Sequence, residues 1–151
     1  MATWTLIRQS GGRPAGHPVV DGYLALWQIV RDRMDRAPNP GARLAARDEA
    51  RELVGYLDRY RRVYPVGRTA HLRVTGELQL RDGDHDGARR SFLAALDAAR
   101  ALDQRADLAL AHAAVARTSS ASDGARDRHL AEAQAFAAAC GMASASVEDG
   151  M

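Results

Sequence analysis

Carboxylates, histidines and one thiol are the side chains of this 151-residue chain that could do chemistry. The run Asp82-Gly83-Asp84-His85-Asp86-Gly87 has carboxylates at alternating positions and glycine at the sixth, like the first half of a calcium loop. A bidentate Glu should occupy the twelfth position of such a loop, but Leu93 stands there. We therefore interpret this run as a turn between two helices, in which Asp84 or Asp86 caps the second helix.

The histidines and the cysteine show no spacing typical of a catalytic or metal site. No two histidines are four residues apart, the spacing that places two ligands on one helix face. His129 and Glu132 are three apart, and such a single pair is more typical of a surface contact. His112 lies in the most apolar segment, so we expect a hydrogen-bonded, partly buried side chain. Cys140 stands near a predicted helix C-terminus, where the helix dipole disfavours thiolate, so we expect it to pack in the core. These residues predict no metal site, no cofactor and no catalytic constellation.

The charge pattern favours a solvated surface over a nucleic-acid interface. All 21 basic residues are Arg, and the 31 Ala residues indicate a GC-rich bacterial genome. Residues 1–83 carry 14 Arg against 9 acidic residues, a charge of +5, whereas residues 84–151 carry 7 against 10, a charge of −3. Most of the Arg residues alternate with carboxylates, as expected for surface ion pairs. The exception is a cluster that could contact phosphate or stabilise a helix C-terminus, namely Arg59, Arg61 and Arg62 beside Tyr60 and Tyr64.

Hydropathy and cysteine content bear on localisation. The first 20 residues contain no apolar run long enough for a signal peptide, and no later run approaches the ~20 residues of a membrane span. A single cysteine cannot form an intrachain disulfide, which fits a reducing compartment. We therefore expect a soluble cytoplasmic protein with no membrane partner.

Apolar residues at helical spacing predict six helices, and Ala and Arg both favour this state. The predicted ranges are residues 21–36, 40–63, 65–81, 86–102 and 108–116, with a last helix that ends at 140. Asn39 and Pro40 are typical of a helix start, and Gly141 is typical of a helix end. We expect three regions, which are an irregular arm rich in Gly and Pro (residues 1–20), a helical-repeat domain (21–141) and a disordered tail (142–151).

The segment from Leu72 to Leu96 has the spacing of a tetratricopeptide-type helical hairpin. Small residues of this segment, which include Gly76, Ala88 and Ala95, allow two antiparallel helices to approach closely. Gly83 turns the chain, and Phe92 fills the space where the next helix leans in. A degraded repeat recurs at offsets of 38 and then 44 residues, in the sets Ala50, Val54, Leu57; Ala88, Phe92, Ala95; and Glu132, Phe136, Ala139. Three hairpins at this spacing are about the minimum for a self-supporting stack.

These motifs resemble the C-terminal helical-repeat region of large bacterial regulatory ATPases, among them LuxR-type activators and adenylate or guanylate cyclases with ATPase and tetratricopeptide repeats. The resemblance rests on the run Tyr64-Pro65-Val66-Gly67-Arg68 and on Leu72, Gly76, Leu80, Gly83, Ala88, Phe92, Ala95, Leu96, Ala99 and Leu102. It implies an all-α, tetratricopeptide-like solenoid of about three hairpins that serves as a sensor or docking platform. The chemistry of that family belongs to other domains, and a chain without Lys contains no ATP-binding P-loop. Thr75 and Gln79 depart from the family pattern, which usually has larger apolar residues there.

In such a stack the first helix of each pair lines the concave face. The candidate partner-binding residues are therefore Arg73 and Glu77 on the third helix and Asp107 and Arg117 on the fifth. Alternatively, Arg73 and Glu77 simply pair with each other, four residues apart on one helix.

The leading hypothesis is a non-catalytic regulatory module that binds a protein or peptide on its concave face. One alternative is a small-molecule sensor of a transcriptional or cyclase-type regulator, and another is an all-helical enzyme for which no site residue can be named. A homo-oligomer formed through an exposed end helix is also open.

Overall fold

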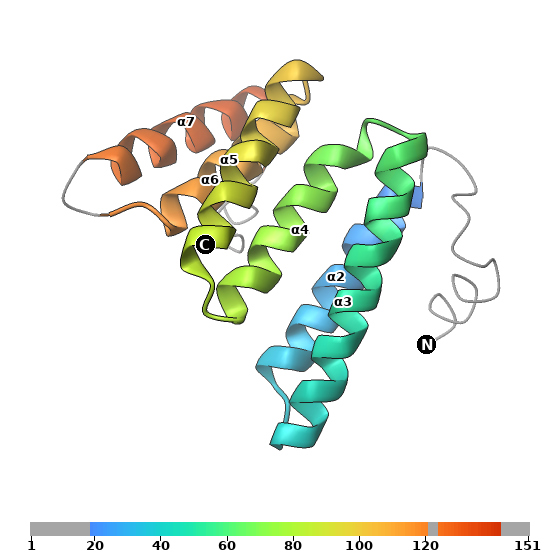
Figure 1. The fold of residues 1–151 in the computed structure, drawn as a ribbon. Coiled ribbons are helices and arrows are strands. Elements are labelled where there is room, and N and C mark those ends of the chain that lie inside the picture. Colours follow the sequence, from blue (N-terminus) through green and yellow to red (C-terminus); the bar gives the residue numbers. More distant parts are fainter. Residues whose placement is uncertain (1–18, 121–123, 143–151) are drawn as a thin grey trace. The chain divides into compact units, whose positions relative to one another are not determined.

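The described part of the chain is entirely helical. The computed structural model describes residues 19–120 and 124–142, and these residues form six α-helices and no strand (Figure 1). The helices are α2 (Val19–Asp35), α3 (Pro40–Val63), α4 (Gly67–Arg81), α5 (His85–Ala101), α6 (Arg105–Arg117) and α7 (Ala125–Ala139). The prediction of an all-helical fold is confirmed for these residues.

The helix ends lie within three residues of the predicted ends. The largest difference is at α6, which begins at Arg105 because the polar residues of its first turn carry little apolar signal. Helix α2 begins at Val19, so the last two residues of the predicted N-terminal arm belong to a helix. The rest of that arm and the predicted tail from residue 143 onward lie outside the described residues.

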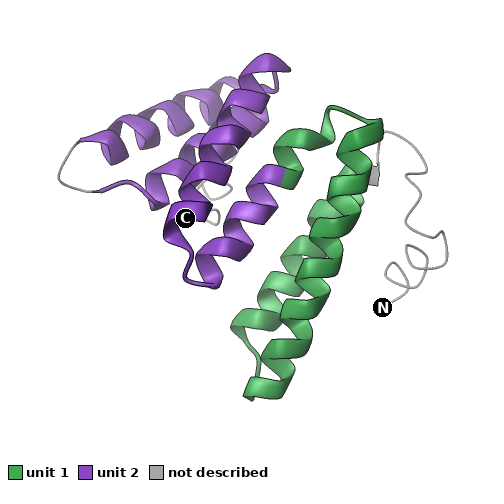
Figure 2. Cartoon of the chain, in the orientation of Figure 1, with its two compact units in different colours: residues 1–71 green, residues 72–151 purple. Residues whose placement is uncertain are grey.

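The chain divides into two compact units, with the boundary inside α4 (Figure 2). Unit 1 is residues 1–71 and contains α2, α3 and the first turn of α4. Unit 2 is residues 72–151 and contains the rest of α4 together with α5, α6 and α7.

In unit 1, α2 and α3 pack side by side as a helical hairpin. The Tyr23 ring of α2 meets the Tyr60 ring of α3 edge to face, with centroids 5.8 Å apart. The turn between the helices is as predicted, because the Ala42 N–H donates to Asn39 Oδ1 at 2.9 Å and proline occupies the first helical turn. The fully buried side chains of this hairpin include Trp27, Val30, Leu53, Leu57 and Tyr60.

In unit 2, consecutive helices pack on one another. Gly76 of α4 lies so close to the buried Phe92 ring of α5 that an added Cβ would be 2.5 Å from a ring carbon. Helix α6 packs on both α5 and α7, which explains why it is apolar on nearly every side. Its buried alanines facing α7, Ala109 and Ala113, form one apolar cluster with Ala133 and Ala137.

Three helices end in the same hydrogen-bonded turn, the Schellman motif. At the end of α4, Gly83 N–H donates to Leu80 O at 3.1 Å, and Asp84 N–H donates to Gln79 O at 2.9 Å. The same two bonds recur at the ends of α5 and α7 with φ positive at the central residue, which is Gly83 (82°), Asp103 (48°) and Gly141 (66°). Helix α6 ends differently, since the Thr118 and Ser119 hydroxyls both donate to Val115 O.

The run that resembles half of a calcium loop is a turn, as interpreted from the sequence. The Gly87 N–H donates to Asp84 Oδ1 at 2.8 Å, so Asp84 is the residue that caps α5. An added Cβ at Gly87 would collide with this carboxylate, which accounts for the second glycine of the run.

We predict that Gly76→Ala destabilises the protein by about 1–3 kcal/mol, because the methyl group overlaps the Phe92 ring. Gly55→Ala is the matched control, since the nearest atom to its new Cβ is Arg59 Nη1 at 3.9 Å. The control should gain about 0.5–1 kcal/mol from helix propensity. Urea unfolding monitored by circular dichroism measures both, and equal effects would contradict the close approach of α4 and α5.

We predict that Asp103→Gly stabilises the protein by about 0.5–1 kcal/mol, because a positive φ is strained for residues with a Cβ. Asp103→Ala is the control, since it removes the same exposed ion pair with Arg105 but keeps the Cβ. The control should lose stability in the same unfolding assay. A gain for both variants would assign the effect to the lost carboxylate instead of the backbone.

Candidate functional site

Polar side chains gather in three clusters of the described residues. One lies in unit 1 and two lie in unit 2. We call them the Asp58 cluster (Asp58, Arg61, Arg62, His71), the Glu77 cluster (Arg73, Glu77, Arg117) and the histidine pair (His112, His129).

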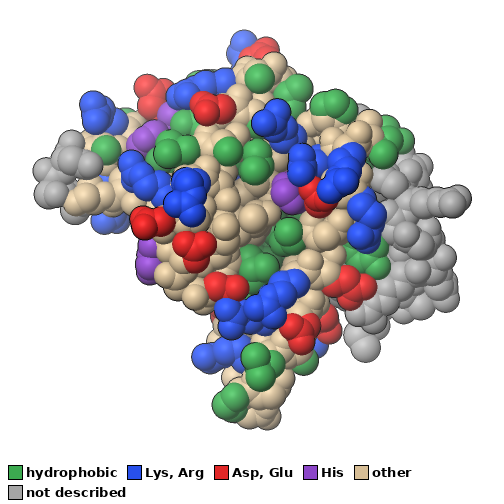
Figure 3. Space-filling view, viewed as in Figure 1, with side chains coloured by type: hydrophobic (Ala, Val, Ile, Leu, Met, Phe, Trp, Pro, Cys, Tyr) green, Lys and Arg blue, Asp and Glu red, His purple; other side chains and the backbone are tan. Residues whose placement is uncertain are grey.

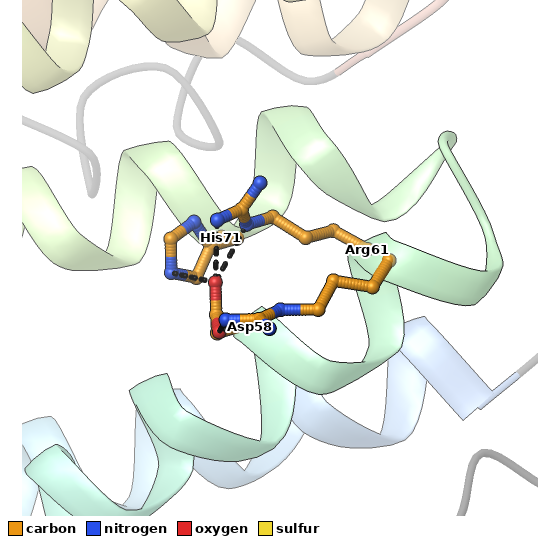
Figure 4. Close-up of polar contacts among 4 residues, drawn as sticks. Asp58, Arg61 and His71 are labelled. Atoms are coloured by element: carbon orange, nitrogen blue, oxygen red, sulfur yellow. Dashed lines mark hydrogen bonds and ion pairs between the residues drawn. The ribbon is translucent and has the colours of Figure 1, made fainter.

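In the Asp58 cluster, one carboxylate accepts hydrogen bonds from two arginines of the same helix (Figure 4). Arg61 Nη2 lies 2.5 Å from Asp58 Oδ1, and Arg62 Nη2 lies 2.6 Å from Asp58 Oδ2. Burial would raise the pKa of Asp58, but the bonds from Arg62 and Arg61 outweigh it and hold the pKa below its usual value. His71 Nε2 is 3.8 Å from this carboxylate, and burial lowers the pKa of its imidazole.

This arrangement favours the structural interpretation of the arginine cluster predicted from the sequence. Arg61 and Arg62 lie in the last turn of α3, where positive charge stabilises the helix, and both point back to Asp58. The guanidinium of Arg59 stacks over the Tyr56 ring, 4.5 Å from its centroid. The three arginines therefore have partners within the protein.

The Glu77 cluster brings three of the four predicted partner-binding residues together. Arg73 Nη1 is 3.4 Å from Glu77 Oε1, and Arg117 Nη2 is 3.9 Å from the same oxygen. Phe92 adjoins the cluster, since its ring centroid lies 5.3 Å from the Arg117 guanidinium carbon. Asp107, the fourth residue, is half-buried in the first turn of α6, about 15 Å along the helix from Arg117.

Two of the three residues of the Glu77 cluster are buried, and Arg117 is partly buried. Glu77 is 3% exposed and Arg73 is 8% exposed, so neither side chain lies open to a partner as the concave-face prediction requires. The structure shows the pairing of these two residues that the sequence also predicted as an alternative. Two guanidinium groups share one carboxylate here, and the buried Nε of Arg73 has no hydrogen-bond partner. Because an unpaired buried charge is costly, the cluster depends on Glu77.

The histidine pair joins two helices. His112 Nδ1 of α6 lies 3.0 Å from His129 Nδ1 of α7, and the Phe136 ring stacks on His112 with centroids 5.8 Å apart. His112 is hydrogen-bonded as predicted, and at 4% exposed it is more deeply buried than the partly buried side chain that the sequence predicted. Burial is the largest cause that lowers the pKa of both imidazoles, and nearby positive charge lowers it further.

This pair was not predicted from the sequence, because spacing rules for a metal or catalytic site relate residues on one helix face. The two histidines are 17 residues apart and meet only because α6 and α7 pack together. One sequence signal does point to the pair, namely the polar residue His112 in the most apolar helix. A buried polar side chain needs a hydrogen-bond partner, which a neighbouring helix has to supply. Within residues 19–120 and 124–142, no group of three His, Cys, Asp or Glu side chains could hold a metal ion.

Other features of the described residues also bear on function. Cys140 is exposed at the end of α7, so the prediction that it packs in the core is wrong. It occupies the C-cap position, just after the last residue of the helix. None of the described helices combines the length and apolar character needed to cross a membrane. Arg and acidic side chains intermingle on the face seen in Figure 3, as the charge pattern predicts.

Unit 1 contains an open pocket of about 430 Å³ at the turn between α2 and α3. Its wall is mainly apolar, with two arginines and one aspartate. The lining residues include Ile29, Arg33, Arg36, Pro38 and Ala42.

Comparisons with protein-family models, with curated protein sequences and with solved structures gave no match. The clusters and the pocket are therefore the observations that bear on function.

We predict that Glu77→Gln destabilises the protein by about 3 kcal/mol, because the buried guanidinium of Arg73 and the partly buried one of Arg117 lose their shared charge partner. Asp97→Asn is the matched control, since it removes an exposed pair with Arg100 and should cost less than about 1 kcal/mol. Chemical unfolding of the three proteins measures the difference. Similar small losses in both variants would show that Glu77 does not hold the cluster together.

Proposed function

We propose that the chain is a non-catalytic, tetratricopeptide-like helical module that binds a protein or peptide. The observation that carries this proposal is the repeated construction of unit 2. There, α4 and α5 meet at Gly76 and Phe92, α5 packs on α6 and α6 packs on α7, and a Schellman turn ends three of the four helices. Short helices that pack on their sequence neighbours are the building pattern of helical-repeat proteins, which bind partners along an extended face.

The proposed partner contacts are Asp107 and Arg117 on α6. Asp107 is half-buried in the first turn, and the Arg117 side chain is 16% exposed at the other end. Arg73 and Glu77 act as positioning residues, because Glu77 fixes one guanidinium nitrogen of Arg117 and Arg73 supports Glu77. A partner with a basic group spaced about 15 Å from an acidic group would match this helix.

The test is affinity capture by the purified chain from a lysate of the source organism, followed by calorimetry with the purified partner. The variant is Asp107→Arg, and the matched control is Asp97→Arg, which makes the same charge change on the exposed face of α5. We expect the wild type and the control to bind alike and the Asp107 variant to bind at least tenfold more weakly, about 1.4 kcal/mol. Equal binding by all three, or no enriched protein, would contradict the proposal.

A small-molecule sensor is the second candidate, and the pocket in unit 1 supports it. Its volume of about 430 Å³ lies in the usual range for small ligands, and Arg33 and Arg36 would favour an acidic group. Arg33 Nη1 already lies 2.5 Å from Glu49, so a ligand has to compete with this ion pair. The test is a thermal-shift screen of carboxylate-containing metabolites against the wild type and Ala42→Trp, which fills the pocket. A shift seen in both proteins would place the ligand elsewhere.

A further inference from the structure

Helix α7 is held to α6 mainly by small side chains. Only Ala133 and Ala137 of α7 are buried, while Phe136 and Met142 pack at the margin of the same cluster. The helix starts after Gly124, which supplies no side-chain cap. With so little apolar area buried, one polar contact between the two helices has a large share in holding α7 in place.

That contact is the histidine pair, and its geometry allows only certain protonation states. At a separation of 3.0 Å, one Nδ1 must donate a proton and the other must accept it. A neutral pair satisfies this condition, and so does a pair with one additional proton on an Nε2 atom. When both imidazoles are charged, two N–H groups point at each other and the hydrogen bond is replaced by repulsion.

The surroundings oppose the charged states. The positive charge of Arg100 on α5 lowers the pKa of both imidazoles. The charges of Arg89 on α5 and Arg128 on α7 lower the pKa of His129. Glu132, one turn after His129 on α7, is the one carboxylate among these charged neighbours, and it raises the pKa of both imidazoles. Positive neighbours therefore outnumber negative ones around a largely buried pair, so protons bind more readily when α7 has left α6.

We propose that the histidine pair is an acid-sensitive contact that keeps α7 packed on α6 at neutral pH and releases it when both imidazoles are protonated. Because α7 is the last described helix, no other described helix has to move when it separates, and the loss at the α5–α6 cluster is the contact of Phe136. Release uncovers the face of α6 that carries Ala109 and Ala113. This inference does not rest on the proposed partner binding.

The direction of the pH effect follows from the folded-state pKa values. Both lie below the ordinary histidine value of about 6.5 that the released helix would show. The packing of α7 on α6 is therefore most stable above pH 6.5, and it weakens as the pH falls from 6.5 through the folded-state pKa values. Within that window the opening equilibrium rises by up to tenfold per pH unit for each histidine.

The experiment is amide hydrogen exchange of the full chain between pH 7.5 and 5.0, corrected for intrinsic exchange rates and read by mass spectrometry. We expect the opening of α7 to increase at least tenfold between pH 7 and 5.5, with a much smaller change in α5. In His129→Gln only His112 can still be charged, so the increase should be clearly smaller than in the wild type. His85→Gln is the matched control, because it removes an exposed histidine of α5 and should leave the response intact.

Two results would overturn the proposal: an α7 opening that does not depend on pH, or one whose pH dependence is as large in His129→Gln as in the wild type. If His129→Gln does not fold, the proposal is tested on the wild type, by following the titration of the two imidazoles by nuclear magnetic resonance. Two coupled titrations below pH 6.5, accompanied by loss of protection in α7, support the contact. Independent titrations near pH 6.5 with α7 unchanged rule it out.

Discussion

The packing of unit 2 depends on the point where α4, α5 and α6 meet. Gly76 lets the Phe92 ring approach the α4 backbone, and the guanidinium of Arg117 lies over that ring from α6. The next residue of α4, Glu77, pairs with the same arginine. An apolar contact and a buried ion pair therefore fix the same three helices at one place. Neither tolerates displacement, because the ring fits only against a glycine and the carboxylate serves two guanidinium groups.

Alanine has a second structural role beside its helix propensity. Helix α6 touches neighbours on two sides, and five of its eight buried residues are alanines. Leu108 and Ala111 join the cluster with α5, while Ala109 and Ala113 join the cluster with α7. Small residues permit close helix approach but remove little apolar area from water. The polar contacts at Glu77 and between the histidines are therefore important in a unit that has few large core side chains.

Local signals in the sequence predicted the helices and most of their ends. Apolar periodicity located the six described helices, and the cap at Asn39 and the turn at Gly83 follow from residue type. That small residues let helices approach was also predicted, but the contact of Gly76 with Phe92 became clear only from the structure. The clusters could not be predicted as well, because they depend on the register between helices. A charged pair four residues apart on one helix looks the same whether buried or exposed, so the burial of Glu77 became clear only from the structure.

The exposure of Cys140 at the end of α7 could not be predicted from the sequence either. Cys140 continues the apolar pattern of α7 in the sequence but takes the C-cap position, where the chain leaves the helix and the side chain is exposed. The contact between His112 and His129 requires two helices to be aligned, which no spacing rule for a single helix describes. Local chemistry thus determined the elements, while tertiary packing determined which polar groups met.

The short turns of unit 2 also bear on how the chain acquires its structure. Three residues connect α4 to α5, and three connect α5 to α6, so contacts between these helices join residues close in sequence. Loop closure then costs little conformational entropy, and chains with such local contacts fold on microsecond to millisecond timescales. On the ribosome, each helix of unit 2 can dock on the one made before it without waiting for a distant segment.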